Sequence, residues 1–423
     1  MDIELLKRII VSNRQLIKDV VVVHREYILD NNMNYVFTGV RQSGKTYLMY
    51  QRIQELLRGG VDIKTILYVN FDDERLIGFS SADFDLLLQA HYQIEESKPI
   101  LFLDEVQNVL SWEKFARRMA NEKYRVYITG SNAKMLSSEF ATILGGRYQI
   151  VNVYPYSFRE YLAVNKVGID PESLYNDVVV NSVRRHLSSY FHNGGFPESV
   201  VALQKRDWLS ALFQKMLLGD IVARYSIKNV NSLTYLIKKI SESVKQPISC
   251  TRLAQLVSSL GSKIQVNTLI DYLRFLEESW ILLSVSNFAS RFVEREGIKK
   301  YYFCDNGLLN LFLMDGETSL LENMVAINLK RIYGNEVYYY RKNVEVDFYL
   351  PTHNSLIQVS YSLSDMETKH REISSLLKAA DYLNAESMMV ITMEENDVID
   401  VQGKRIEVVP LWRWLLNECY VKS

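Results

Sequence analysis

Cysteine is scarce in this sequence, which has three of them, Cys250, Cys304 and Cys419, in 423 residues. Their spacing does not match the paired ligands of a zinc site. An odd and sparse set also excludes a disulfide-stapled scaffold and favours a reducing compartment, so we expect a cytoplasmic protein.

A surplus of either charge and a long apolar run are also lacking. Lys and Arg total 49 against 50 for Asp and Glu, so the formal net charge of −1 gives no overall attraction to DNA or anionic membranes. The first residues lack the blocks of a signal peptide, and no apolar run is long enough to span a bilayer. We therefore expect no membrane partner. The hydrophobic share of 48% is that of a globular chain, whose length suffices for two to four domains.

One short segment carries a definite chemistry. A short apolar run at 35–38 precedes the pattern G-x-x-x-x-G-K-[ST], and a helical pattern follows from about residue 46 to 54. This order of strand, loop and helix predicts a phosphate-binding loop (P-loop) that binds ATP. Lys45 would pair with the β- and γ-phosphates, and the Thr46 hydroxyl would be a ligand for Mg²⁺. The loop residues are Gly39, Val40, Arg41, Gln42, Ser43, Gly44, Lys45 and Thr46.

A second apolar run, residues 99–103, ends in two carboxylates, Asp104 and Glu105. In P-loop enzymes the strand beside the loop strand ends in an acid that holds Mg²⁺, and this role falls to Asp104. The adjacent Glu105 is the expected general base that polarises the attacking water. A buried strand with a solvated acidic end is the alternative, but the complete P-loop upstream favours an ATP hydrolase.

Two further apolar runs, at 66–71 and 124–129, alternate with helical patterns. This alternation predicts an α/β domain with a parallel, doubly wound sheet that binds ligands at the carboxyl ends of its strands. Ser131 and Asn132 follow the later run, so Asn132 is a candidate nucleotide contact near the γ-phosphate. An ordinary turn with a helix N-cap would use the same residue types, and local sequence does not separate the two readings.

Arg147 follows a glycine pair at 145–146. An arginine on a tight turn can stabilise the charge that develops during phosphoryl transfer, so Arg147 is a candidate catalytic residue. It would act within its own chain or on a neighbouring subunit of a homo-oligomer. A surface arginine after a helix is the simpler alternative.

These motifs together resemble a family of bacterial and archaeal AAA-type ATPases whose second half is uncharacterised. The resemblance rests on the P-loop, the segments 71–76, 103–107, 129–132 and 155–161, the Gly-Gly-Phe-Pro-Glu motif at 194–198, and Asp220-Ile221 with Arg224. It implies a P-loop AAA-type ATPase domain over 1–160, a helical segment over 161–240, a winged-helix-like module over 241–295 and a restriction-endonuclease-like α/β domain over 296–423. Cofactors would be ATP and Mg²⁺.

The second half can also be read directly. Helical patterns at 251–257 and 266–278 and a strand at 281–285 suit a winged helix, but the second helix carries more acids than bases. Protein packing is therefore favoured over DNA reading, although Lys238, Lys239 and Lys245 leave DNA open. The Gly-Gly-Phe-Pro stretch is a hinge contact or simply a helix stop.

The nuclease-like site of the last region looks degraded. Asp347 matches the first acid of such sites, but Gln358 and Ser360 stand where an acid and a lysine are needed, so we expect no nuclease activity. The favoured function is an ATP-driven switch or remodeler acting on an unknown protein partner. An ATP-regulated DNA-binding or DNA-processing protein and a nucleotide-binding scaffold with negligible turnover are the alternatives.

Overall fold

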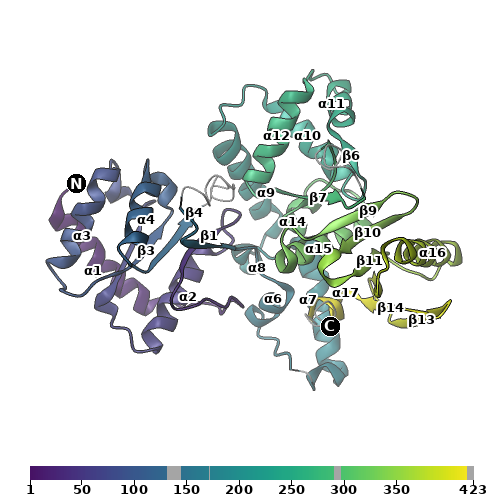
Figure 1. The fold of residues 1–423 in the computed structure, drawn as a ribbon, viewed down its shortest axis with the longest axis horizontal. Helices are drawn as coiled ribbons and strands as arrows, with labels where there is room; N and C mark the ends of the chain where they lie inside the picture. Colours follow the sequence, from purple (N-terminus) through teal and green to yellow (C-terminus); the bar gives the residue numbers. More distant parts are fainter. Residues whose placement is uncertain (131–143, 171, 290–296, 417–423) are drawn as a thin grey trace. The chain divides into compact units, whose positions relative to one another are not determined.

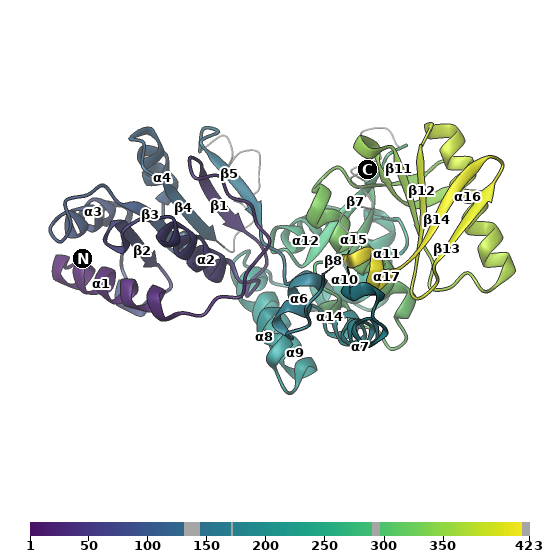
Figure 2. The same cartoon turned by 90° about the horizontal axis from the view of Figure 1, so that it is seen from below.

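The computed structural model describes residues 1–130, 144–170, 172–289 and 297–416. The chain divides into two compact units, Met1–Tyr154 and Pro155–Ser423, shown in Figures 1 and 2. The division lies close to the predicted end of the ATPase domain at residue 160. Among the described helices, none combines the length and the apolar character that crossing a lipid bilayer requires.

The first unit is built on a parallel sheet of five strands, which confirms the predicted α/β fold. The strand order is β2-β3-β4-β1-β5, and every neighbouring pair is parallel. The strands are β1 (Asn34–Thr38), β2 (Ile66–Asn70), β3 (Ile100–Asp104), β4 (Val126–Gly130) and β5 (Tyr148–Asn152). The helices are α1 (Ile3–Asp19), α2 (Lys45–Arg58), α3 (Phe84–Tyr92) and α4 (Trp112–Asn121), with short 3-10 turns at Ile63–Thr65, Glu74–Leu76, Ser81–Asp83 and Val106–Asn108.

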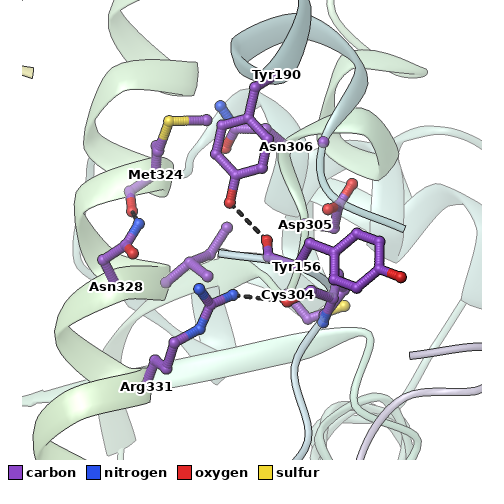
Figure 3. Close-up of a pocket in the computed structure, with 11 residues that line it drawn as sticks. Tyr156, Tyr190, Cys304, Asp305, Asn306, Met324, Asn328 and Arg331 are labelled. Atoms are coloured by element: carbon purple, nitrogen blue, oxygen red, sulfur yellow. Dashed lines mark hydrogen bonds between the residues drawn. The ribbon is translucent and has the colours of Figure 1, made fainter. Parts of the chain in front are cut away.

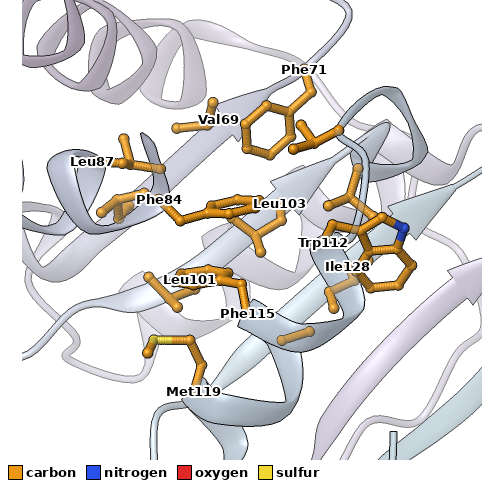
Figure 4. Packing of buried hydrophobic residues seen from close by; sticks show 14 of the residues in the cluster. Val69, Phe71, Phe84, Leu87, Leu101, Leu103, Trp112, Phe115, Met119 and Ile128 are labelled. Carbon is orange, nitrogen blue, oxygen red and sulfur yellow. The ribbon is translucent and has the colours of Figure 1, made fainter. Parts of the chain in front are cut away.

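Alternate residues of the central strands enter two apolar clusters, because successive side chains of a strand point to opposite faces. On one face, Leu101 and Leu103 of β3 pack with residues of α1, α3 and α4, including Trp112 and Phe115, as Figure 4 shows. On the other face, Phe102 packs with residues of α2. Burial on both faces explains why these strands read as continuous apolar runs.

The second unit begins with helices, and the predicted helical segment over 161–240 lies among them. Ser157 caps the first of them through a capping box with Glu160. The segment Met216–Ala223 is a π-helix, labelled η7, that continues directly from the preceding helix. The other helices of the region are α6 (Phe158–Val164), α7 (Asp177–Asn193), α8 (Pro197–Val201), α9 (Lys205–Lys215) and α10 (Val230–Glu242).

One mixed sheet of nine strands runs through the rest of this unit, in the order β13-β14-β12-β11-β10-β9-β7-β8-β6. The strands are β6 (Ile248–Ser249), β7 (Leu282–Asn287), β8 (Ile298–Phe303), β9 (Tyr338–Arg341), β10 (Glu345–Leu350), β11 (Ser355–Val359), β12 (Ser387–Thr392), β13 (Asp397–Val401) and β14 (Lys404–Pro410). The helices are α11 (Cys250–Ser259), α12 (Val266–Glu278), α14 (Asn306–Asn310), α15 (Glu317–Tyr333), α16 (Met366–Leu383) and α17 (Leu411–Leu416).

The nine-stranded sheet includes strands from both the predicted winged-helix-like module and the predicted C-terminal domain. The helices expected for a winged helix are present as α11 and α12, and Ser249 caps the first of them. The strand that follows, β7, pairs with both β8 and β9. The predicted limit at residue 295 therefore falls between two neighbouring strands of one sheet. The winged-helix and restriction-endonuclease-like assignments, and the limits at 240 and 295, stay predictions.

Candidate nucleotide-binding site

The predicted P-loop connects β1 to α2 at the carboxyl edge of the parallel sheet. Gly44 has a φ of 93°, in the left-handed region that favours glycine. At Gly39 a Cβ would lie 2.1 Å from the carbonyl oxygen of Val153, so only glycine fits beside β5. Glycine at these two positions lets the loop lead directly into α2, whose N-terminal end suits an anion.

Lys45 lies folded over the loop. Its side chain is buried, and its Nζ donates to the carbonyl oxygens of Gly39 at 3.1 Å and Val40 at 3.0 Å. The Ser43 hydroxyl is also buried, and it finds no hydrogen-bond partner among the described residues. A loop with a buried ammonium and an unsatisfied hydroxyl suits a phosphate, which accepts hydrogen bonds from both.

Arg25 holds the loop from the other side, and sequence reasoning missed it. Its guanidinium donates to the carbonyl oxygens of Ser43 at 3.0 Å and Tyr154 at 2.8 Å, and the residue is buried. The backbone of Arg25 is fixed in turn, since its N–H and its carbonyl both bond the side chain of Gln51 on α2. No local pattern marks this arginine, because its partners lie 18 to 129 residues away.

Asp104 is fully buried at the end of β3 and is held by three hydroxyls. It accepts hydrogen bonds from Thr129, from Tyr68 at 2.8 Å and from the Thr46 side chain. Burial raises the pKa of the Asp104 carboxyl. The negative charge of Glu105 raises this pKa further, whereas the three hydrogen bonds lower it. The predicted metal ligands Thr46 and Asp104 are thus in contact.

Glu105 follows the strand in a left-handed conformation, with a φ of 51°. Its N–H donates to the Thr129 hydroxyl at 2.9 Å, and its carboxylate accepts a hydrogen bond of 2.5 Å from Gln107. The Thr129 hydroxyl therefore donates to the Asp104 carboxylate and accepts from the backbone N–H of Glu105. Neither Thr129 nor Gln107 had been singled out, although Thr129 ends a predicted strand at the carboxyl edge.

Arg147 is not brought to the loop. It is exposed and precedes β5, which runs parallel to β1 with Asn34 opposite Tyr148. Arg147 therefore lies at the amino edge of the sheet, about 15 Å along β5 from the P-loop edge at roughly 3.3 Å per residue. This placement does not support a contact with phosphate in the same chain. The other candidate, Asn132, lies outside the described residues.

The described residues hold no cluster of three or more His, Cys, Asp or Glu side chains arranged to bind a metal. A Mg²⁺ ion at a phosphate site needs fewer protein ligands, because phosphate oxygens and water complete its octahedral shell. A threonine hydroxyl and a buried carboxylate in contact, Thr46 and Asp104, fit that arrangement.

The Gly-Gly-Phe-Pro motif has a structural reason in the second unit. Asp305, at the start of α14, accepts the N–H of Gly195 and the N–H of Gly307, each at 2.8 Å. A Cβ on Gly194 would lie 1.8 Å from the Asp305 carboxylate, so the two segments require glycine to meet. Figure 3 shows Asp305 beside Tyr156 and Tyr190 in a small cavity.

Two side chains that line this cavity donate hydrogen bonds to the first residues of the second unit. The Tyr190 hydroxyl donates to the carbonyl of Tyr156, and Arg331 donates to that of Pro155, each at 2.8 Å (Figure 3). These two hydrogen bonds therefore anchor the start of the second unit to α7 and α15. Burial raises the pKa of Asp305 to about 6, while its backbone N–H partners lower it.

The fold and the loop together define an AAA-type P-loop domain. Residues 31–162 match the family model of an AAA domain, and residues 184–319 and 317–414 match two domains of unknown function, DUF8612 and DUF4143. An uncharacterised protein of Methanocaldococcus jannaschii is 30% identical over 98% of this chain and 95% of its own length. The chain belongs to the same family as that protein.

Two more distant likenesses accompany this one. An uncharacterised protein of Haemophilus influenzae is 29% identical over 92% of this chain and 95% of its own length. Among solved structures, a Walker-type ATPase of Pyrococcus abyssi is similar at 12% identity and a TM-score of 0.39, covering 70% of this chain and 99% of that one. A likeness at this TM-score assigns no function.

Proposed function

We propose that this protein binds ATP with Mg²⁺ at the P-loop, hydrolyses it, and acts as a switch or remodeler on a protein partner. The observation that carries the proposal is the meeting of two sequence-distant segments, the P-loop and the end of β3, at one sheet edge. Thr46 of the P-loop contacts the Asp104 carboxylate, and the Thr129 hydroxyl bonds both that carboxylate and the backbone N–H of Glu105.

Each group has a distinct task in this proposal. Lys45 exchanges its carbonyl partners for phosphate oxygens and compensates their charge. Thr46 and Asp104 are the protein ligands of Mg²⁺, and the bound ion would supply the positive charge that keeps the buried Asp104 ionised. Glu105, oriented by Gln107, accepts a hydrogen bond from the attacking water and takes its proton.

A short path connects this site to the surface of the same unit. Asn108 lies in the 3-10 turn that starts directly after Glu105. Its side chain donates to the carbonyl of Phe71 at 3.2 Å and to the Asp72 carboxylate at 3.4 Å. The loop that follows these residues exposes 82% of Ile77. A shift of Glu105 between nucleotide states would therefore move a surface loop, as a switch requires.

A protein partner is favoured over DNA because two cations near the predicted winged helix, Arg274 and Lys239, pair with carboxylates of their own helices. Arg274 bonds Asp271 at 2.9 Å, and Lys239 bonds Glu242 at 2.7 Å, each on its own helix. Lys245 donates to the Thr318 hydroxyl. A reader of DNA presents a row of basic side chains whose charge is available to phosphates.

The decisive experiment compares Glu105→Gln with Lys45→Ala. Glu105→Gln should bind ATP as the parent does and lose phosphate release by ~10²-fold or more, because the base is removed. Lys45→Ala should lose ATP binding itself, measured with a fluorescent nucleotide. Glu122→Gln, an exposed carboxylate at the end of α4, is the matched control and should change neither property.

Two results would reject parts of the proposal. Parent-rate hydrolysis by Glu105→Gln would show that Glu105 is not the base. Tight ATP binding by the parent without any phosphate release would support a nucleotide-binding scaffold instead. The Glu105→Gln protein is also the form to use for capturing a partner with ATP bound.

A further inference from the structure

A groove opens on the surface of the first unit, between the loop that follows β2 and the turn that follows β3. Its volume is about 330 Å³. This volume is near the lower end of the ~300–1,000 Å³ of ligand pockets, so the groove suits a few side chains. Its buried apolar lining consists of Phe71, Leu76, Phe79 and Val109.

Two large apolar side chains are exposed on the segments that form this groove. Ile77, which lines it, is 82% exposed, and Leu110, the neighbour of Val109 in the chain, is 86% exposed. Single exposed apolar residues are ordinary, but these two belong to the two segments that enclose an apolar hollow. A ligand with apolar groups would be stabilised here by removing this surface from water.

The charged residues that line the groove are all acidic. They are Asp72, Asp73 and Glu74, and none of the described lining residues is Lys or Arg. Asp73 forms an ion pair with Arg75 at 2.6 Å, which offsets its charge. Asp72 and Glu74 are exposed, and Asp72 meets only a neutral amide, that of Asn108 at 3.4 Å, among its side-chain hydrogen bonds. The groove therefore favours a cationic ligand over nucleic acid or any other anion.

Both walls of the groove are hydrogen-bonded to the backbone of the predicted catalytic carboxylates. The N–H of Phe71 donates to the carbonyl oxygen of Asp104 at 2.9 Å, and the N–H of Asn108 donates to that of Glu105 at 3.1 Å. The Asn108 side chain also joins the two walls, since it donates to the carbonyl oxygen of Phe71 at 3.2 Å. A ligand that shifts either wall would therefore shift the end of β3.

We propose that this groove docks a segment of a protein partner that inserts a large apolar side chain and places Lys or Arg against Asp72 and Glu74. Docking changes the rate of ATP hydrolysis through the hydrogen bonds to Asp104 and Glu105. The docking itself needs no nucleotide, whereas its effect on hydrolysis rests on the proposed function.

The test starts from a library of short random peptides displayed on phage and selected on the full chain without nucleotide. Enriched peptides should combine a large apolar residue with neighbouring Lys or Arg, and their affinity is then measured by fluorescence anisotropy. Ile77→Ser should weaken binding ~10-fold or more, because apolar contact is lost. Asp72→Asn/Glu74→Gln should weaken it ~5-fold or more and reduce its dependence on salt.

Matched controls separate the groove from the rest of the surface. Val11→Ser removes an exposed apolar side chain of α1, and Glu122→Gln removes an exposed carboxylate at the end of α4. Both variants should bind the peptides as the parent does. A Lys-rich peptide without a large apolar residue should bind much more weakly than the enriched peptides.

Three results would overturn the docking site. They are a selection that enriches no peptide or acidic peptides, binding that neither Ile77→Ser nor Asp72→Asn/Glu74→Gln weakens, and equal binding of the Lys-rich control peptide. Each of these measurements is made without ATP, so none depends on hydrolysis.

Phosphate release then tests the link to the nucleotide site. A bound peptide should change the rate of the parent, and it should have no effect at the same concentration on Ile77→Ser, whose own basal rate should equal that of the parent. Peptide that fills the groove of an active parent without changing its rate would overturn the link. A parent that hydrolyses no ATP would reject the proposed function and leave the result on docking standing.

Discussion

Replacing Thr129 with valine should loosen the ATPase site without changing its shape. The Thr129 hydroxyl donates to the buried Asp104 carboxylate and accepts the N–H of Glu105, and valine can do neither. A hydrogen bond to a charged group contributes ~1.5–3 kcal/mol and a neutral one ~1 kcal/mol. Since Tyr68 and Thr46 still bond Asp104, we expect a loss of about 2–3 kcal/mol of local stability.

Hydrogen exchange in the full chain measures this loss directly. Amides of β3 and β4 should exchange ~30-fold or more faster in Thr129→Val, since 1.4 kcal/mol corresponds to a factor of ten. ATP turnover should fall by ~10-fold or more, because Glu105 loses an orienting contact. Thr129→Ser keeps the hydroxyl and is the control. Parent-like exchange and parent-like turnover in Thr129→Val would refute the assigned role.

Three further predictions address the other assignments. Arg147→Ala should slow hydrolysis up to ~10³-fold only if Arg147 reaches a neighbouring subunit, in which case mixing it with the P-loop lysine variant restores activity; unchanged turnover removes Arg147 from the site. Gly194→Ala should destabilise the second unit by more than ~2 kcal/mol in urea unfolding, because its Cβ would meet Asp305. Gly403→Ala, with a similar φ and open space around it, should cost ~1 kcal/mol, and equal effects would contradict the clash. Purified protein with Mg²⁺ or Mn²⁺ should leave DNA and RNA intact, and cleavage that Asp347→Ala abolishes would establish a nuclease.

The sheet of the first unit could be predicted because burial of both faces makes each strand a continuous apolar run. β1, β3 and β4 show this pattern, and the order of strand, P-loop and helix predicted which edge of the sheet would hold a phosphate. The edge strand β5 was not predicted, because its sequence Tyr-Gln-Ile-Val-Asn mixes polar and apolar residues and the strand is only partly buried. Without β5, nothing in the sequence placed Arg147 at the amino edge.

The contacts that the sequence did not reveal are those between distant residues of ordinary type. Arg25 lies in an irregular segment, and its role depends on carbonyl oxygens, which no side-chain pattern marks. Lys300 of β8 and Asp347 of β10 are in contact but lie 47 residues apart, so no local pattern revealed their ion pair. Long-range pairing of this kind is set by packing of the sheet.

Trp112 gives the first unit an optical property of its own. Residues 1–154 contain no other tryptophan, and the remaining four, at 208, 280, 412 and 414, belong to the second unit. Trp112 is buried in the cluster that also contains Val106, the first residue of the turn after Glu105, and Val109, which follows that turn. With phenylalanine at the other four positions, the emission of Trp112 would report any nucleotide-dependent repacking beside Glu105 within the intact chain.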